Sequence, residues 1–378
     1  MSRALPAVVS WVLGAVLGLG GCGHTAERRE RIESDQRYAA AERAYSGRRD
    51  TEADRLFEEV AATGDVEAAA LSTYRRAQIR ERAGDFEGAL AMYRAAEVYP
   101  APERRAFAGW RIARIYLEKQ GKRAEGRAAL QALIDRWPDA SASDRAAKYL
   151  AIRRSPEEAA DRHLDREMAD WLRAAAERHA GHSVADNLLF WAAYAQVYRL
   201  GDVGGARTTL SAMVERYYVS PLLDDGLWLL GAIERRQGRL EAALAAYEAI
   251  LHIREDQNYL IMGYRSRRLD DAAIGVALVQ HHLRGDLPAA ARAYQRLLDE
   301  FPTTVFRDDA WWGLACVQQL QGQVDASRKS LRAFVAELPD SRYAKRAQAI
   351  LDGKAECPPP DPALARTPLL HPQVKGEM

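Results

Sequence analysis

Few side chains in this sequence have the types and spacing for chemistry, and their context favours structural roles. Three acidic pairs recur along the chain: Asp224-Asp225, Asp270-Asp271 and Asp308-Asp309. Paired carboxylates could serve as acid and base or bind calcium. Each pair, however, stands just before a segment with a helical apolar pattern, where an acid caps the helix and stabilises the positive end of its dipole. We therefore interpret the pairs as capping residues.

The remaining polar residues do not assemble into a metal site or a cofactor loop. The adjacent histidines His281 and His282 cannot share a helix face, because ligands on a helix need a spacing of three or four. Phosphate-loop and nucleophile-elbow motifs do not occur. The segment Gly201-Asp202-Val203-Gly204-Gly205 lacks the preceding strand of a dinucleotide loop. The sequence thus predicts a protein that is not an enzyme and holds no metal and no cofactor.

Cys22 has the most specific chemical context. Before it, one positive residue, Arg3, precedes an apolar run, which is typical of an export signal. The run ends at Leu19-Gly20-Gly21-Cys22, which resembles the bacterial lipobox. That resemblance implies a signal peptide over 1-21, a lipid (diacylglycerol and palmitate) on Cys22, and a linker over 22-36. A plain secretory signal and an uncleaved membrane helix are the alternatives, although the run is short for a span of about 20 residues.

Two further inferences concern the cysteines. By resemblance to the enterobacterial sorting rule, Gly23 after the lipidated cysteine implies the periplasmic face of the outer membrane, with an inner-membrane lipoprotein as the alternative. Cys316 lies in a helical pattern and Cys357 in the segment Glu356-Cys357-Pro358. A bridge between these two is open, because the sequence gives no distance between them.

Composition limits the function classes. The 378 residues are 48% hydrophobic and 28% charged, which is ordinary for a protein with a packed core. Lys and Arg number 54 against 53 Asp and Glu, and without residues 1-21, which contribute only Arg3, the count is 53 against 53. This neutrality gives no electrostatic case for binding nucleic acid.

The body of the chain is an internal repeat marked by glycines in predicted turns. Their spacings are 37, 80, 37, 47 and 37 residues, and the glycines are Gly84, Gly121, Gly201, Gly238, Gly285 and Gly322. Apolar residues at helical spacing precede and follow each glycine, which predicts a helix, a tight turn and a second helix. The second helices share a small residue followed four positions later by a large one: Ala53/Phe57, Ala89/Tyr93, Gly126/Leu130, Ala206/Leu210, Ala243/Tyr247, Ala290/Tyr294 and Ser327/Leu331. We expect the small residue to allow close helix approach.

This pattern resembles the tetratricopeptide repeat, whose consensus has Trp-x-x-Leu-Gly in the first helix, Ala-x-x-x-Phe in the second and Pro at the end. The likeness is strongest at Trp311-Trp312-Gly313-Leu314 and at Leu227-Trp228-Leu229-Leu230-Gly231. Arg114 and Tyr194 depart from it, because they replace the consensus glycine, and we expect altered packing there. The resemblance implies an all-α, right-handed helical solenoid of about seven to eight helix pairs over 37-352.

Two junctions resemble those of envelope repeat families. They are Tyr217-Tyr218-Val219-Ser220-Pro221-Leu222-Leu223-Asp224-Asp225 and Phe301-Pro302-Thr303-Thr304-Val305-Phe306-Arg307-Asp308-Asp309-Ala310. The families are those of the lipoprotein BamD and of the periplasmic protein associated with the Tol-Pal system. Three further segments interrupt the pattern. We expect an irregular repeat between Gly121 and Gly201, a lengthened helix pair or a loop at 252-268, and a disordered Pro-rich tail over 353-378.

Function then depends on the surface formed by the first helices, which line a concave groove in such solenoids. The position ten residues before each turn glycine holds Tyr74, Arg111, Trp191, Trp228, Gly275 and Trp312. These rings either pack between neighbouring helices or anchor a partner, for which aromatic and Arg residues are suited. The same unit as Trp228 carries Arg235 and Arg236, which could pair with a partner carboxylate or remain solvated.

The expected function is a membrane-anchored protein-protein interaction scaffold or assembly factor of the bacterial cell envelope. The candidate partner-binding residues are Tyr74, Trp191, Trp228, Trp312, Arg235 and Arg236. The expected partner is another envelope protein or protein complex, with no nucleic acid. The alternative is a glycan- or peptidoglycan-binding accessory lipoprotein that uses the same aromatic groove.

Overall fold

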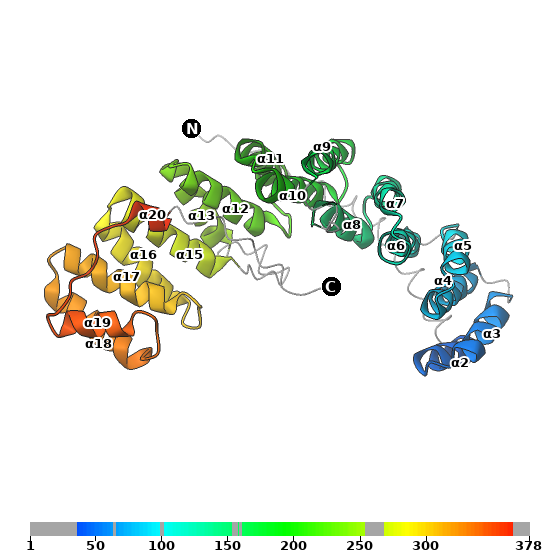
Figure 1. The fold of residues 1–378 in the computed structure, drawn as a ribbon, viewed down its shortest axis with the longest axis horizontal. Coiled ribbons are helices and arrows are strands. Elements are labelled where there is room, and N and C mark those ends of the chain that lie inside the picture. The colour runs from blue at the N-terminus through cyan, green and yellow to red at the C-terminus, as the bar shows by residue number, and fades with distance from the viewer. Residues whose placement is uncertain are drawn as a thin grey trace, which may run out of the picture. The chain divides into compact units, whose positions relative to one another are not determined.

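The computed structural model describes residues 36–62, 66–98, 102–152, 158, 161–253 and 268–365. These residues form helices and connecting turns, and no strand occurs in these ranges (Figure 1). The predicted all-α helical solenoid is therefore confirmed. Cys22, its signal peptide, nearly all of the linker, residues 254–267 of the insertion and the tail beyond Ala365 lie outside the described residues.

The chain divides into two compact units. The first unit comprises Met1–Leu150 together with His182–Val184. Its helices are α2 (Gln36–Ser46), α3 (Asp50–Ala61), α4 (Val66–Ala83), α5 (Phe86–Ala96), α6 (Pro102–Arg114), η1 (Ile115–Lys119), α7 (Arg123–Arg136) and α8 (Ser141–Ile152), whose last two residues belong to the second unit. Each of the pairs α2/α3, α4/α5 and α6/α7 packs as an antiparallel helix pair around a tight turn.

The second unit comprises Ala151–Gly181 and Ala185–Met378. Its helices are α9 (Arg162–Arg178), α10 (Ala185–Ala195), η2 (Gln196–Leu200), α11 (Val203–Arg216), α12 (Leu223–Arg236), α13 (Leu240–Ile253), α15 (Leu269–Leu278), η3 (Val279–Arg284), α16 (Leu287–Glu300), α17 (Arg307–Leu320), α18 (Val324–Glu337), α19 (Ala344–Leu351) and α20 (Pro362–Ala365). From α10 to α18, each helix packs on the next along the chain.

The turn glycines end the first helices as predicted. All six have φ between 67° and 81°, a left-handed conformation that costs other residues energy and glycine none. At three of these turns the following residue is an aspartate that caps the second helix. Asp85, Asp202 and Asp286 accept hydrogen bonds from backbone N–H groups three residues on, at 2.9, 2.8 and 3.0 Å. The Gly-Asp dipeptide thus stops one helix and starts the next.

The small and large residues of the second helices belong to the core within and between neighbouring helix pairs, and every one of the fourteen is buried. Tyr294 of α16 shows the closeness of this packing. A Cβ atom added to Gly313 of α17 would lie 2.3 Å from Cζ of the Tyr294 ring. The glycine is therefore required because the ring occupies the space of a side chain.

Three first helices end in a π-helical turn, namely η1, η2 and η3. Elsewhere, the N–H after the turn glycine bonds a carbonyl five residues back, as from Arg239 to Glu234. In the three π-helical units the bond spans six residues, as from Asp286 to Gln280. Each of these helices thus contains one extra residue, which is the usual origin of a π-bulge.

The extra residue explains the departures from the consensus glycine. Seven residues before the glycine, the regular units carry the small buried residues Ala77, Gly231 and Ala315. The π-helical units carry Arg114, Tyr194 and Leu278 there, and their fully buried alanines stand one position earlier, at Ala113, Ala193 and Ala277. The expected change at Arg114 and Tyr194 is therefore a shift in register by one residue.

The acidic pairs differ from the expectation that they cap helices. The cap positions of α12, α15 and α17 are Leu222, Arg268 and Phe306, and none makes a side-chain cap bond. The acids lie in the first turn, where they still face the positive end of the dipole. Asp270 and Asp308 each accept a backbone N–H of the first turn, from Asp271 at 3.0 Å and from Asp309 at 2.9 Å. They also accept hydrogen bonds from hydroxyl groups of the following junction, Thr304 at 2.8 Å and Ser341 at 3.0 Å.

These hydroxyls form a recurring link between neighbouring repeats. Each hydroxyl oxygen also accepts the backbone N–H two residues on, with Phe306 donating to Thr304 and Tyr343 to Ser341, both at 3.2 Å. Asp186 and Ser220 repeat the arrangement at an earlier junction of the second unit. The acids therefore act as acceptors that fix the next junction, which the cap interpretation missed.

Candidate functional site

The candidate site is the face of the first helices that contains the residues ten, six and three positions before the turn glycine. We call it the first-helix face. Residues at these spacings, such as Trp312, Cys316 and Gln319 of α17, fall on one side of an α-helix because it has 3.6 residues per turn. The candidate residues predicted from the sequence stand ten residues before the glycine in every unit.

The π-helical turns make that count wrong in three units. Because of the extra residue, the position equivalent to that of Trp228 stands eleven residues before the glycine in these units. It holds Trp110, Phe190 and Ile274. Arg111, Trp191 and Gly275 are therefore not equivalent to Trp228. The missed signal was the bulky residue seven positions before the glycine, where the regular units carry a small one.

Trp191 lies in the core of the second unit, and only 7% of it is exposed. Its ring meets Phe190 and Tyr194 edge-on, with centroids 5.0 and 5.4 Å away. The structure thus places this candidate among packing residues rather than on the first-helix face. Gly275 is also buried, because the ring of Tyr247 lies 2.9 Å from where its Cβ would stand.

Trp228 of α12 is partly exposed and is covered on one face by the next repeat. The guanidinium of Arg268 lies 4.5 Å from the ring centroid. Arg268 is held there by Asp225 at 2.6 Å and Asp271 at 3.1 Å. Burial alone would lower the pKa of Arg268, but the two carboxylates outweigh it and raise the pKa. The cation is therefore fixed over the ring.

Trp312 of α17 has a similar arrangement with different partners. Its ring stacks on Tyr343, just before α19, with centroids 5.2 Å apart and planes within 4°. The guanidinium of Arg346 lies 5.5 Å from the Trp312 centroid. Trp110 of α6 likewise meets Tyr149 of α8 at 5.7 Å. In these units the ring therefore reaches the following first helix and links neighbouring repeats.

Tyr74 of α4 differs, because its ring meets Tyr93 of its own second helix at 5.4 Å. Tyr93 in turn donates to Glu81 at 2.7 Å, and Arg111 lies 3.5 Å from the same carboxylate. Tyr74 is half-buried, so part of its surface faces solvent. Arg111 of α6 is thus paired with the preceding repeat. Tyr74 is the aromatic ring on the first-helix face of α4.

The two basic candidates of α12 lie in different surroundings. Arg236 is exposed on the last turn. Arg235 is half-buried, and its Nε atom is buried without a hydrogen-bond partner among the described residues. Arg235 follows Trp228 by seven residues, so both lie on the first-helix face.

In the part of the chain that the structure describes, no three His, Cys, Asp or Glu side chains are grouped so that they could hold a metal ion. Within the same residues, no helix combines the length and apolarity needed to cross a bilayer.

Comparison with known families supports the repeat assignment. Two tetratricopeptide-repeat models match the chain, one over residues 197–259 and 283–342 and the other over residues 107–140. The chain contains tetratricopeptide repeats. These matches include α12, α17 and α6, so the tetratricopeptide repeats carry Trp228, Trp312 and Trp110. No curated protein matches the chain in sequence.

Solved structures resemble the tetratricopeptide-repeat chain at low identity. The C-terminal part of a repeat-containing protein from Cytophaga hutchinsonii is 13% identical, with a TM-score of 0.43 over 72% of this chain and 98% of that one. A Rap protein complexed with competence and sporulation factor is 12% identical, with a TM-score of 0.32 over 80% and 81% of the two chains. The tetratricopeptide domain of P58(IPK) is 13% identical, with a TM-score of 0.25 over 86% and 89%. Identities this low say nothing about partners.

Proposed function

We propose that this tetratricopeptide-repeat protein is an interaction scaffold or assembly factor of the bacterial cell envelope, held at a membrane by lipid on Cys22. Tetratricopeptide repeats imply protein–protein interaction, which is the coarser part of the proposal. The observation that carries it is the recurrence of partly exposed aromatic rings on the first-helix face, at Tyr74, Trp110, Trp228 and Trp312. Aromatic side chains bury a large area at little entropic cost, which suits them to anchor a partner.

The partner we propose is an extended protein segment that carries an acidic side chain. Trp228 supplies an apolar contact, and Arg235 supplies a donor seven residues further along the same face. Arg236 is exposed nearby and adds a second positive charge. A carboxylate placed on this pair would form charge-assisted hydrogen bonds, which are stronger than neutral ones.

The membrane attachment is proposed from the residues around Cys22. The Cys22→Ser variant removes the thiol that would carry the lipid, and we expect it to incorporate no labelled palmitate and to leave the membrane fraction. Stable anchoring needs two or more acyl chains, which a lipidated cysteine supplies. Wild-type protein that takes up no palmitate would contradict the anchor.

Gly23 suggests the outer membrane as the location. Sucrose-gradient fractionation should therefore place the wild-type protein with outer-membrane markers. Recovery with inner-membrane markers would overturn the location while leaving the anchor in place.

Capture from detergent extracts tests the scaffold role. A scaffold should retain a protein partner in stoichiometric amount through washing. The Arg235→Ala and Arg236→Ala double variant should recover less of that partner, and the loss should be greater at low salt because charge pairs are screened as salt rises. If the protein brought no protein partner and instead pelleted with murein sacculi, a glycan-binding role would replace the scaffold.

A further inference from the structure

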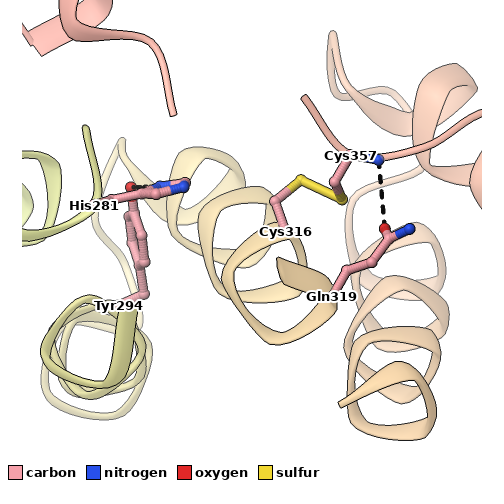
Figure 2. The surroundings of a disulfide bond; sticks show 5 residues. All are labelled: His281, Tyr294, Cys316, Gln319 and Cys357. Atoms are coloured by element: carbon pink, nitrogen blue, oxygen red, sulfur yellow. Dashed lines mark hydrogen bonds between the residues drawn. A yellow bond between two sulfur atoms is a disulfide. The ribbon is translucent and has the colours of Figure 1, made fainter. Parts of the chain in front are cut away.

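The segment after α19 returns to the first helices of two earlier repeats. Gly353 ends α19 with φ 72°, and the chain then runs to the short helix α20, which contacts η3. We call residues 354–361 the strap. Cys357 in the strap is 9% exposed and is joined by a disulfide to Cys316 of α17, with Cα atoms 5.2 Å apart (Figure 2). The structure thus forms the bridge that the sequence left open, and it places the first part of the predicted disordered tail against the solenoid.

The strap is built to be held by its backbone. Residues 358–360 are prolines, which have no N–H group and favour an extended conformation. The N–H groups on either side of them belong to Cys357 and Asp361. Cys357 N–H donates to Gln319 Oε1 at 3.4 Å, and Asp361 N–H donates to His282 Nδ1 at 3.1 Å. Both donors that flank the prolines are therefore satisfied by side chains of first helices.

The two acceptors lie in the last turns of successive first helices. Gln319 lies three residues before Gly322, and His282 lies three residues before Gly285. Burial lowers the pKa of His282 and so favours the neutral ring, although Asp361 opposes this shift. The Asp361 N–H, which donates to Nδ1, identifies that nitrogen as the acceptor. Two repeats before Gln319, the corresponding residue is Arg235, whose Nε lacks a partner among the described residues.

The strap and the proposed partner use the same face. Cys316 and Gln319 follow Trp312 by four and seven residues, so all three lie on the first-helix face of α17. Trp312 packs against the buried cluster that contains Cys316 and Cys357. The strap therefore covers this face of α17 and contacts the last turn of the preceding first helix at His282. Trp228 and Arg235 of α12 lie one repeat before the His282 contact.

We propose that the strap is a built-in occupant of the first-helix face of α17 that reaches the end of the preceding first helix. It competes with the extended segment of a partner for the first helices that end at Gly285 and Gly322. The proposal rests on the proposed function and adds to it the chemistry of the ligand. That ligand is an extended, proline-containing segment whose backbone N–H groups, four residues apart, meet Gln319 and His282. A tethered segment has an effective concentration in the mM range, so it excludes a free segment of similar affinity.

The test uses the full chain with residues 354–361 replaced by Gly and Ser, which removes the strap at constant length. The probe is a fluorescent peptide with the sequence of residues 354–365 and Ser in place of Cys357. We expect the chain without the strap to bind this peptide at least tenfold more tightly than the oxidised wild type does. Adding Gln319→Ala and His282→Ala to the chain without the strap should abolish this gain in affinity. The control is Gln295→Ala, which changes an exposed glutamine of the second helix α16 and should leave the affinity unchanged.

The proposal would be overturned if the peptide bound the wild type and the chain without the strap with equal affinity. It would also be overturned if the chain without the strap had the wild-type dichroism spectrum and did not bind the peptide. If the replaced chain does not fold, hydrogen exchange in the oxidised wild type decides. Slow exchange at Cys357 and Asp361 N–H supports the strap as a bound ligand, and exchange at the rate of a free peptide overturns it. The proposed function can fail independently of the strap proposal. It fails if capture from detergent extracts recovers no protein partner although the peptide binds the chain without the strap. A partner recovered equally from both chains would contradict the competition alone.

Discussion

Replacement of Gly313 by alanine tests the packing that defines the repeat. The added Cβ would stand 2.3 Å from Cζ and 2.5 Å from Cε1 of Tyr294. Tyr294 has little room to move, because it is 2% exposed and its hydroxyl lies 3.2 Å from His281 Nδ1. Overpacking of this kind costs about 1–3 kcal/mol or more, and the overlap with a ring places Gly313→Ala at the upper end. Alanine recovers about 1 kcal/mol of helix propensity, so we expect a net loss of about 2 kcal/mol.

Thermal unfolding followed by far-ultraviolet dichroism measures this loss. For a unit of about 200 residues, 2 kcal/mol corresponds to a fall in Tm of roughly 4–8 °C. Gly204→Ala is the matched control, since Gly204 is an exposed glycine in α11 and its Cβ would meet nothing closer than Asp202 Oδ1 at 3.9 Å. That variant should melt at or slightly above the wild-type temperature. A Gly313→Ala variant as stable as the Gly204→Ala variant would refute the packing argument.

Two further predictions concern a buried histidine and a hydroxyl group at a junction between repeats. Burial, followed by the neighbouring His282, lowers the pKa of His281 from 6.5 to about 3. Because the unfolded chain binds this proton more readily, the stability due to neutral His281 is present above pH 6.5 and is lost as pH falls from 6.5 toward 3. As pH falls, the free energy of unfolding measured by chemical denaturation should therefore decline more steeply for the wild type than for His281→Gln, by up to about 1.4 kcal/mol per pH unit. Parallel curves for the two proteins would contradict the lowered pKa of His281. Thr304→Val removes the hydroxyl that joins Asp270 to the Phe306 N–H, and it should lower the free energy of unfolding in urea by about 1–3 kcal/mol. Thr303→Val changes an exposed residue and should alter the free energy of unfolding by under about 0.5 kcal/mol. Equal effects of the two variants would count against the link at the junction.

The repeat could be predicted because its signals are local. Each turn glycine stands between two helical apolar patterns, and the small and large residues recur four positions apart in one helix. Short segments of sequence carry this information, and the structure confirms it from the φ of Gly238 to the burial of Ala243 and Tyr247. The class of fold followed from them.

The register of the candidate site could not be predicted by counting from the glycine. A π-helical turn adds one residue without changing the apolar pattern enough to reveal it. Tyr194 carried the signal, because a bulky residue stood where Gly231 and Ala315 are small, but only the backbone bonds show the direction of the shift. Trp191 was therefore placed on the first-helix face although it lies in the core.

The strap was missed for a different reason. Proline-rich composition indicates a chain that forms no helix or sheet, and it does not distinguish a free tail from one bound through its backbone. The contacts that hold the strap join residues far apart in the chain, such as Cys316 with Cys357, 41 residues apart. Such a contact depends on the three-dimensional path of the solenoid.

The most direct test of the interaction face is Trp228→Ala, assayed in parallel for affinity and for thermal stability. Trp171→Ala is the control, because Trp171 lies on α9, outside the first-helix face. With the partner recovered from detergent extracts, Trp228→Ala should weaken binding by about 2 kcal/mol, or roughly thirtyfold, in a chain that stays folded, while Trp171→Ala binds as the wild type does. Wild-type affinity together with a melting temperature several degrees lower would show that the ring only packs against Arg268, and would contradict the account.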